Sequence, residues 1–154
     1  MGTLHESRTI LLFFVTLTIG ACTPDDVDEP DGADAGISAS CAEAANHSDL
    51  EWIQDNIFTT SCAASGACHQ GAAAGANGLS LDRGASEAAL VDVLSREDPA
   101  SMLVVAGDPD SSYLLHILGR DPPASAVITR DMPLAAPLLC DEKVEAIARW
   151  VSSL

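Results

Sequence analysis

The segment from Cys62 to His69 constrains this chain more than any other, because it places two thiols and an imidazole within eight residues. Cys62 and Cys68 are separated by five residues, and His69 follows the second cysteine directly. Thiolate sulfur and imidazole nitrogen are side-chain donors that bind metals and cofactors. In an oxidising compartment the same two thiols could instead close a short loop as a disulfide. The segment therefore predicts either a cofactor site or a disulfide-closed loop.

Residues 1–21 predict an export signal. The apolar run from Ile10 to Ile19 is too short to cross a bilayer and ends in small residues. The sequence Ile19-Gly20-Ala21-Cys22 resembles the lipobox of bacterial lipoproteins, in which the cysteine is lipidated and becomes the new N-terminus. That resemblance implies an exported protein, lipid-anchored through Cys22 and facing the periplasm or the outer membrane. A secretory signal cut at the same place, with Cys22 unmodified, is the alternative.

Residues 22–40 predict a disordered acidic tether. The segment is rich in aspartate and has Val27 and Ile37 as its only large aliphatic side chains. Such a composition cannot bury enough apolar surface to offset the entropy lost on ordering. We therefore expect a flexible connection between the lipid anchor and a folded domain at residues 41–154. An acidic docking arm or a cation-binding tract is the alternative function of this segment.

The formal net charge of −16 restricts the possible partners. So much negative charge argues against nucleic acid and against direct binding of anionic headgroups, so membrane attachment would occur through the lipid alone. A protein partner is expected to present a basic patch, because complementary potentials accelerate encounter. No Ser-His-Asp order, paired-carboxylate pattern or phosphate-binding glycine loop indicates an enzyme. A zinc site from His47 and the Cys62–His69 segment lacks a familiar spacing.

Residues 41–154 predict one all-α domain of about four to five short helices with long loops. Ser48 is the expected N-cap of the first helix, because Glu51 completes a capping box with it. Asp110 is the expected N-cap of the third. The expected helices run from Ser48 to near Thr59, from about Ser86 to Leu94, from Asp110 to Leu118, and from Cys140 or Asp141 onward.

A cysteine followed directly by histidine, with another cysteine upstream, is typical of haem attachment in c-type cytochromes. The order of a helix, Cys62, Cys68-His69, further helices, Met132-Pro133 and a C-terminal helix resembles a class I c-type cytochrome domain. The likeness is greatest to small cytochrome-c-like domains of exported bacterial proteins, which carry a Gly-Asp-Pro-x-x-Ser segment, here beginning at Gly107, before their Met-Pro.

The resemblance implies a covalent haem c and a role in electron transfer to a redox partner protein. It assigns Cys62 and Cys68 to the thioether bonds, His69 to the proximal position on the iron and Met132 to the distal position. His116 is a rival of Met132. The family usually places two residues between its cysteines, so the small residues 63–67 would have to bulge away from the haem edge.

Two cysteines remain if Cys62 and Cys68 hold haem. Cys41 and Cys140 then form the expected disulfide, which would tie the start of the domain to the start of its last helix. Without haem, three pairings of the four thiols are possible. The alternative protein is a haem-free lipoprotein module, stapled by disulfides, that binds a protein or glycan at the cell surface.

Overall fold

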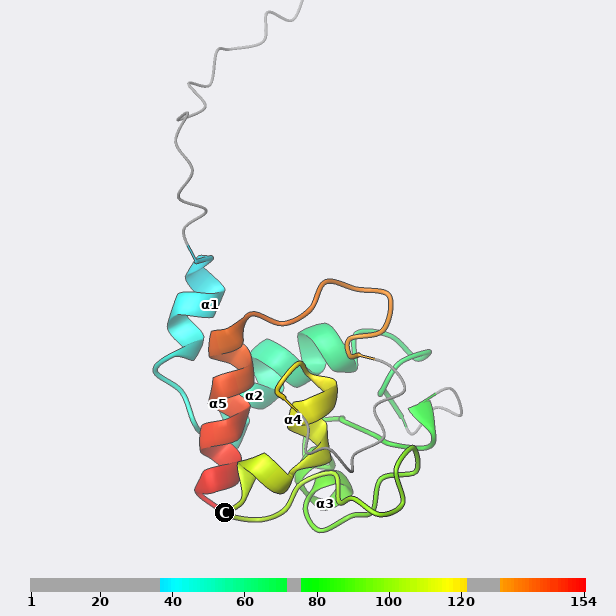
Figure 1. Cartoon of the computed structure of the whole chain (residues 1–154). Coiled ribbons are helices and arrows are strands. Elements are labelled where there is room, and N and C mark those ends of the chain that lie inside the picture. Colours follow the sequence, from blue (N-terminus) through cyan, green and yellow to red (C-terminus); the bar gives the residue numbers. More distant parts are fainter. Residues whose placement is uncertain (1–36, 72–75, 122–130) are drawn as a thin grey trace, which may run out of the picture. The chain divides into compact units, whose positions relative to one another are not determined.

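The computed structural model describes residues 37–71, 76–121 and 131–154 (Figure 1). Every regular element in these ranges is a helix, and pairing of extended backbone is limited there to isolated bridges. The prediction of an all-α domain is confirmed at this level. The predicted signal peptide, the lipidation site Cys22 and most of the tether lie outside the described residues. Within them, no helix combines the length and the apolar character needed to cross a membrane.

Helix α1 (Ala39–Ala44) begins inside the segment predicted to be tether. Its N-cap is Ser38, whose hydroxyl oxygen accepts a hydrogen bond from the backbone N–H of Cys41 at 3.3 Å. The helix thus starts two residues before the predicted start of the domain at residue 41. The Ser38 cap and the disulfide from Cys41 to Cys140 stabilise this helix, which the composition of the segment alone does not predict.

Helix α2 (Leu50–Ile53) continues directly into the π-helix η1 (Gln54–Cys62). The N-cap is Asp49, not Ser48, and its carboxylate accepts a 2.8 Å hydrogen bond from the backbone N–H of Trp52. A carboxylate is favoured there because the helix dipole is positive at that end. The helix also runs past the predicted end at Thr59, so Cys62 is its last residue.

Helix α3 (Ser86–Leu90) is shorter than the predicted helix to Leu94. The backbone becomes extended at Val91, which forms a bridge with Val104, and Leu94 forms one with Met102. Pairing with a distant segment thus replaces the last predicted turn. This tertiary contact is not visible in the local spacing of apolar residues.

The predicted helix from Asp110 to Leu118 is in fact two elements. They are the 3-10 helix η3 (Pro109–Ser111) and helix α4 (Tyr113–Ile117), separated by the extended residue Ser112. The N-cap of η3 is Asp108, whose carboxylate accepts from the backbone N–H of Ser111 at 3.1 Å. Gly119 follows α4 with a φ of 107°, a value that favours glycine, so the predicted stop is confirmed.

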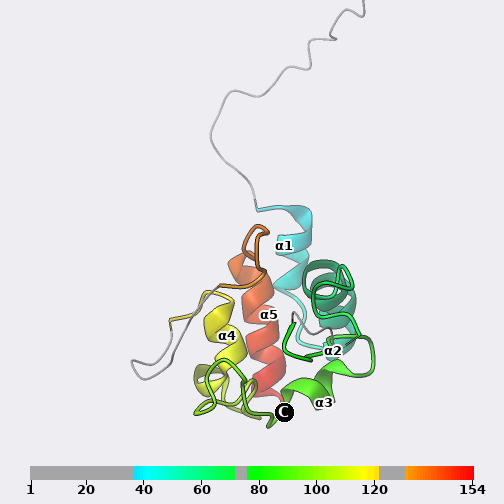
Figure 2. The same cartoon turned by 90° about the vertical axis from the view of Figure 1, so that its right-hand side faces the viewer.

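Helix α5 (Asp141–Ser152) begins where the sequence predicted, and it contacts α1, α2, α4 and η3. Figure 2 shows it between α4 on one side and α1 and α2 on the other. Its buried Trp150 meets Phe58 of η1 edge to face, with ring centroids 6.4 Å apart. Because α5 contacts most other helices, its apolar face is the centre of the core.

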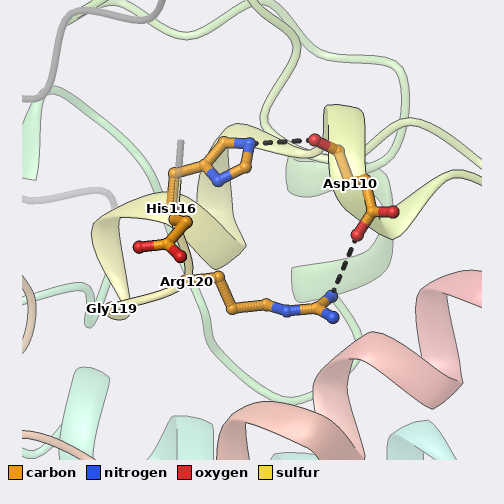
Figure 3. A pocket seen from close by; sticks show the side chains of 5 residues that line it. Asp110, His116, Gly119 and Arg120 are labelled. Atoms are coloured by element: carbon orange, nitrogen blue, oxygen red, sulfur yellow. Dashed lines mark hydrogen bonds and ion pairs between the residues drawn. The ribbon is translucent and has the colours of Figure 1, made fainter. Parts of the chain in front are cut away.

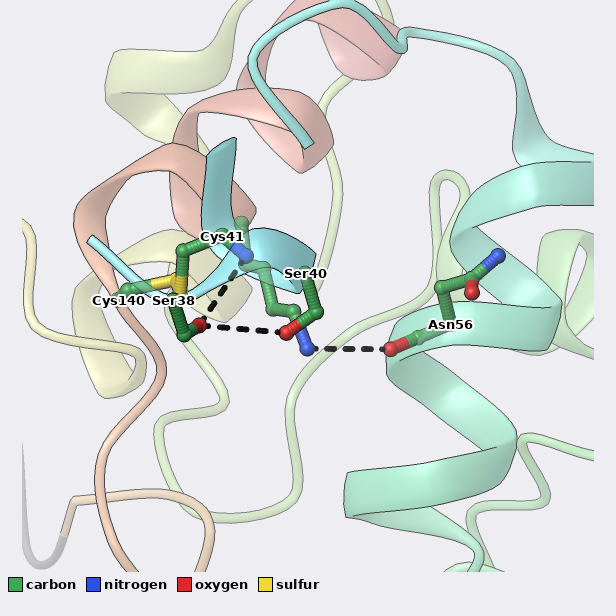
Figure 4. The surroundings of a disulfide bond; sticks show 6 residues. Ser38, Ser40, Cys41, Asn56 and Cys140 are labelled. Atoms are coloured by element: carbon green, nitrogen blue, oxygen red, sulfur yellow. Dashed lines mark hydrogen bonds between the residues drawn. A yellow bond between two sulfur atoms is a disulfide. The ribbon is translucent and has the colours of Figure 1, made fainter. Parts of the chain in front are cut away.

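A disulfide joins Cys41 of α1 to Cys140, the N-cap of α5 (Figure 4). This is the pair expected from the sequence. Lys143 of α5 donates to the backbone carbonyl of Asn56 in η1 at 3.4 Å. At the other end of α5, the Arg149 guanidinium donates to the backbone carbonyl of Ala44 at 2.8 Å. These links fix α1 and η1 against α5, and η1 ends at the candidate site.

Candidate cofactor site

The five residues between the two cysteines form a loop that returns to its starting point. The backbone N–H of His69 donates to the carbonyl oxygen of Cys62 at 3.0 Å, so the two ends are joined. The N–H of Cys68 donates to the carbonyl of Ser65, also at 3.0 Å. Ala63 is buried, whereas residues 64–67 are exposed. The intervening residues therefore bulge outward and leave Cys62 and His69 as neighbours.

The two thiols differ in their surroundings and are not joined to each other. Cys62 is half-buried and packs against the hydrophobic core, whereas Cys68 is exposed. Burial, with a smaller contribution from the negative charge of a Cys68 thiolate, raises the pKa of Cys62 to about 12. Ser65 donates a hydrogen bond from its hydroxyl to the Cys68 sulfur at 3.3 Å. Cys62 is thus a neutral thiol at physiological pH, and both sulfurs are available for bonding.

His69 is held in one tautomer. Its Nδ1 lies 3.3 Å from the backbone carbonyl oxygen of Leu79, and because a carbonyl only accepts, Nδ1 carries the proton. The lone pair is therefore on Nε2. Burial lowers the pKa of His69, and the hydrogen bond to Leu79 opposes that effect only in part. A neutral imidazole with one N–H on a backbone carbonyl is typical of a metal-binding histidine.

Met132 is half-buried and packs against the core. Its backbone N–H donates to the carbonyl of Ile117, the last residue of α4, at 2.7 Å. Within the described residues no hydrogen bond links Met132 to the Cys62–His69 segment. The structure therefore gathers the two cysteines and His69 in one loop and anchors Met132 separately.

His116 lies in a different part of the molecule. It is 5 % exposed, and its Nε2 lies 3.0 Å from the backbone carbonyl oxygen of Asp110. It lines a hollow of about 360 Å³ with Asp110, Gly119, Arg120 and Asp121 (Figure 3). The sequence identified His116 alone and missed this group, because its members come together only through the turns at either end of α4.

The donor set of the Cys62–His69 segment suits haem better than zinc. Within the described residues, the only group of three donors lying within 4.8 Å of one another is Cys41, Cys140 and Glu142, and its two sulfurs form a disulfide. Two free sulfurs beside a neutral imidazole with a lone pair on Nε2 fit covalent haem attachment with histidine ligation.

No protein-family model matches the chain, and neither a curated protein nor a solved structure shows significant similarity to it. The resemblance to c-type cytochromes therefore depends on the sequence motifs alone.

Proposed function

We propose that this protein is an exported, lipid-anchored electron-transfer protein that resembles a c-type cytochrome. Cys62 and Cys68 would hold haem c by thioether bonds, with His69 and Met132 as the axial ligands. The observation that carries the proposal is the tautomer of His69, which leaves Nε2 with a lone pair beside two thiols that are not crosslinked.

Each of these residues has a defined part. The Leu79 carbonyl fixes the ring of His69 and keeps the proton on Nδ1, while burial keeps the imidazole neutral and able to act as a ligand. The small residues 64–67 bulge outward, so the longer spacing does not separate Cys62 from His69. The hydrogen bond from Met132 to Ile117 holds the thioether side chain next to the core.

Bound haem would supply a one-electron couple, with a potential raised by methionine ligation. With both axial positions filled by His69 and Met132, no site remains for a substrate, so the role is outer-sphere electron transfer. The net charge of −16 favours a redox partner with a basic patch. In this proposal the lipid on Cys22 keeps the domain near the membrane, and the acidic segment 22–40 gives it reach.

A second candidate function is a haem-free module in which Cys62 and Cys68 form a disulfide. The observation that favours it is the closure of the loop, since the hydrogen bond between His69 and Cys62 brings the chain back toward its first cysteine. This module would bind a protein or glycan.

The test is to purify the protein from its native host and record its spectrum. Reduced protein should show c-type absorption bands that survive extraction with acidified acetone, because thioether bonds retain the haem. Cys62→Ser combined with Cys68→Ser should lose the covalent attachment, whereas Ser65→Ala, which removes the hydroxyl bonded to the Cys68 sulfur, should retain it. Colourless protein with Cys62 joined to Cys68 would reject the haem proposal and support the module.

A further inference from the structure

Among the described residues, two buried polar atoms at the hollow between η3 and the end of α4 have no hydrogen-bond partner. They are Nδ1 of His116 and Nη1 of Arg120. Because Nε2 of His116 donates to the carbonyl of Asp110, Nδ1 of the neutral ring carries a lone pair and can only accept. Figure 3 shows this second nitrogen on the side of the ring that faces Arg120. Buried polar atoms are rarely left unpaired, so the hollow lacks a component.

The charges around the hollow favour a cation. Asp110 and Asp121 line it, and Glu145 lies beside Arg120 with its Oε1 3.4 Å from Nε. Three carboxylates thus lie at or beside the hollow together with one guanidinium, and two of them, Asp110 and Glu145, pair with it. The lone pair of His116 indicates which kind of cation would bind. Imidazole nitrogen binds zinc, copper and nickel, whereas calcium and magnesium prefer oxygen alone. A histidine whose other N–H is given to a backbone carbonyl is also the usual form of a metal ligand.

We propose that this hollow binds a divalent transition-metal ion such as Zn²⁺, with Nδ1 of His116 and the carboxylate of Asp110 as ligands. Asp121 supplies the third ligand and water the fourth. The donor atoms are not yet within 4.8 Å of one another, so the two aspartates must turn toward His116. Asp110 can do so, because its side chain is 86 % exposed. This site is independent of the proposed haem.

The same movement would satisfy Arg120. Its Nη1 already lies 3.5 Å from Oδ1 of Asp110, an ion pair that does not reach hydrogen-bond geometry. A carboxylate with one oxygen on the metal ion can accept a hydrogen bond from Nη1 with the other. Hydrogen bonds to the ligating carboxylate are a usual part of metal sites. One bound ion thereby gives partners to both atoms that lack them.

The experiment is a Zn²⁺ titration by calorimetry of the full-length mature protein, after metal removal and alkylation of free thiols. One ion per chain should bind. His116→Gln should weaken binding by at least about 100-fold, and Asp110→Asn and Asp121→Asn by about 10-fold or more. His47→Gln is the matched control, because His47 also pairs with an aspartate, Asp49, at 3.1 Å but at the surface. It should change nothing.

Two further measurements separate ligation from folding. Circular dichroism shows whether His116→Gln is folded, and the aspartate variants alter exposed side chains that leave the core intact. Electron paramagnetic resonance of the Cu²⁺ form should show hyperfine coupling to one nitrogen in the wild type and none in folded His116→Gln. Absence of stoichiometric binding, as expected if water alone fills the hollow, would overturn the proposal. So would equal binding by the wild type, His116→Gln and Asp110→Asn.

Discussion

His69 and His116 use the same device in opposite ways. Each gives one ring N–H to a backbone carbonyl, but His69 uses Nδ1 for Leu79, whereas His116 uses Nε2 for Asp110. The nitrogen left with the lone pair is therefore Nε2 in His69 and Nδ1 in His116. The comparison shows that a single backbone carbonyl determines which ring nitrogen of a histidine keeps its lone pair and can bind a metal ion.

The neighbours of the two rings differ as well. His69 lies next to two thiols, and His116 lies among carboxylates. Sulfur donors select soft metals and allow thioether bonds, whereas carboxylate donors accept harder divalent ions. The two histidines thus have different chemical surroundings. The predictions below test whether they also have different roles.

The largest effect expected from this difference concerns the distal ligand of the proposed haem. In the oxidised protein, Met132→Ala should abolish the weak near-infrared band that arises from sulfur bound to iron. His116→Gln should retain the band, because Nε2 of His116 is already bonded to Asp110. Near-infrared absorption of both variants, each purified from the host, measures this directly.

A different result would assign His116, in place of Met132, to the haem iron. Haem without any such band in the wild type would make His116 the ligand to test. The tautomer assigned to its ring would then be wrong for the haem-bound protein.

Removal of the disulfide should affect both regions equally. Cys41→Ala combined with Cys140→Ala should lower the free energy of unfolding by about 3–5 kcal/mol, because the closed loop is long. Helix α5 contacts both α2, which continues into η1, and α4, so loosening it reaches Cys62 and His116 alike. Urea unfolding measures the loss, with Ser152→Ala at the other end of α5 as control. Exchange of amide hydrogens near only one histidine would show that the regions are independent.

The sequence predicted the last helix well and the earlier ones only in part. In α5 the apolar residues Val144, Ile147 and Val151 recur at helical spacing and are buried, so local pattern and tertiary packing agree. Where they disagree, the prediction failed. Asp49 caps α2 in place of Ser48, because the sequence offers two good caps in succession and only packing selects between them.

The candidate sites also differ in how far the local sequence predicts them. The Cys62–His69 segment is contiguous, so its residues could be named from the sequence. The group around His116 could not, because Asp110 and Arg120 reach it through the break at Ser112 and the left-handed turn at Gly119. The tautomers of both histidines also depend on carbonyl groups whose positions are set by the folded chain.

A smaller effect concerns the reactivity of the two thiols in protein that lacks haem. Iodoacetamide should modify exposed Cys68 first and leave Cys62 almost unreacted, since the thiolate is the nucleophile. At pH 8 a thiol with a pKa of about 12 is ionised in only about one molecule in ten thousand. Mass spectrometry of peptides after timed labelling gives both rates. Equal rates in folded protein, with fast labelling of both in urea as control, would contradict the burial of Cys62.

The smallest expected effect is the pH dependence of stability that His69 contributes in the haem-free protein. Burial lowers its pKa in the folded state below the ordinary value of about 6.5 that it has in the unfolded chain. Between those two values the unfolded chain binds more protons, so stability rises with pH and is lost as pH falls through that window. Urea midpoints measured from about pH 7.5 downward should therefore decline in the wild type and decline less in His69→Gln, while His47→Gln, at a half-buried histidine, serves as control. An identical slope in the wild type and His69→Gln would show that His69 is not held neutral by the fold, and the first half of the comparison with His116 would fail.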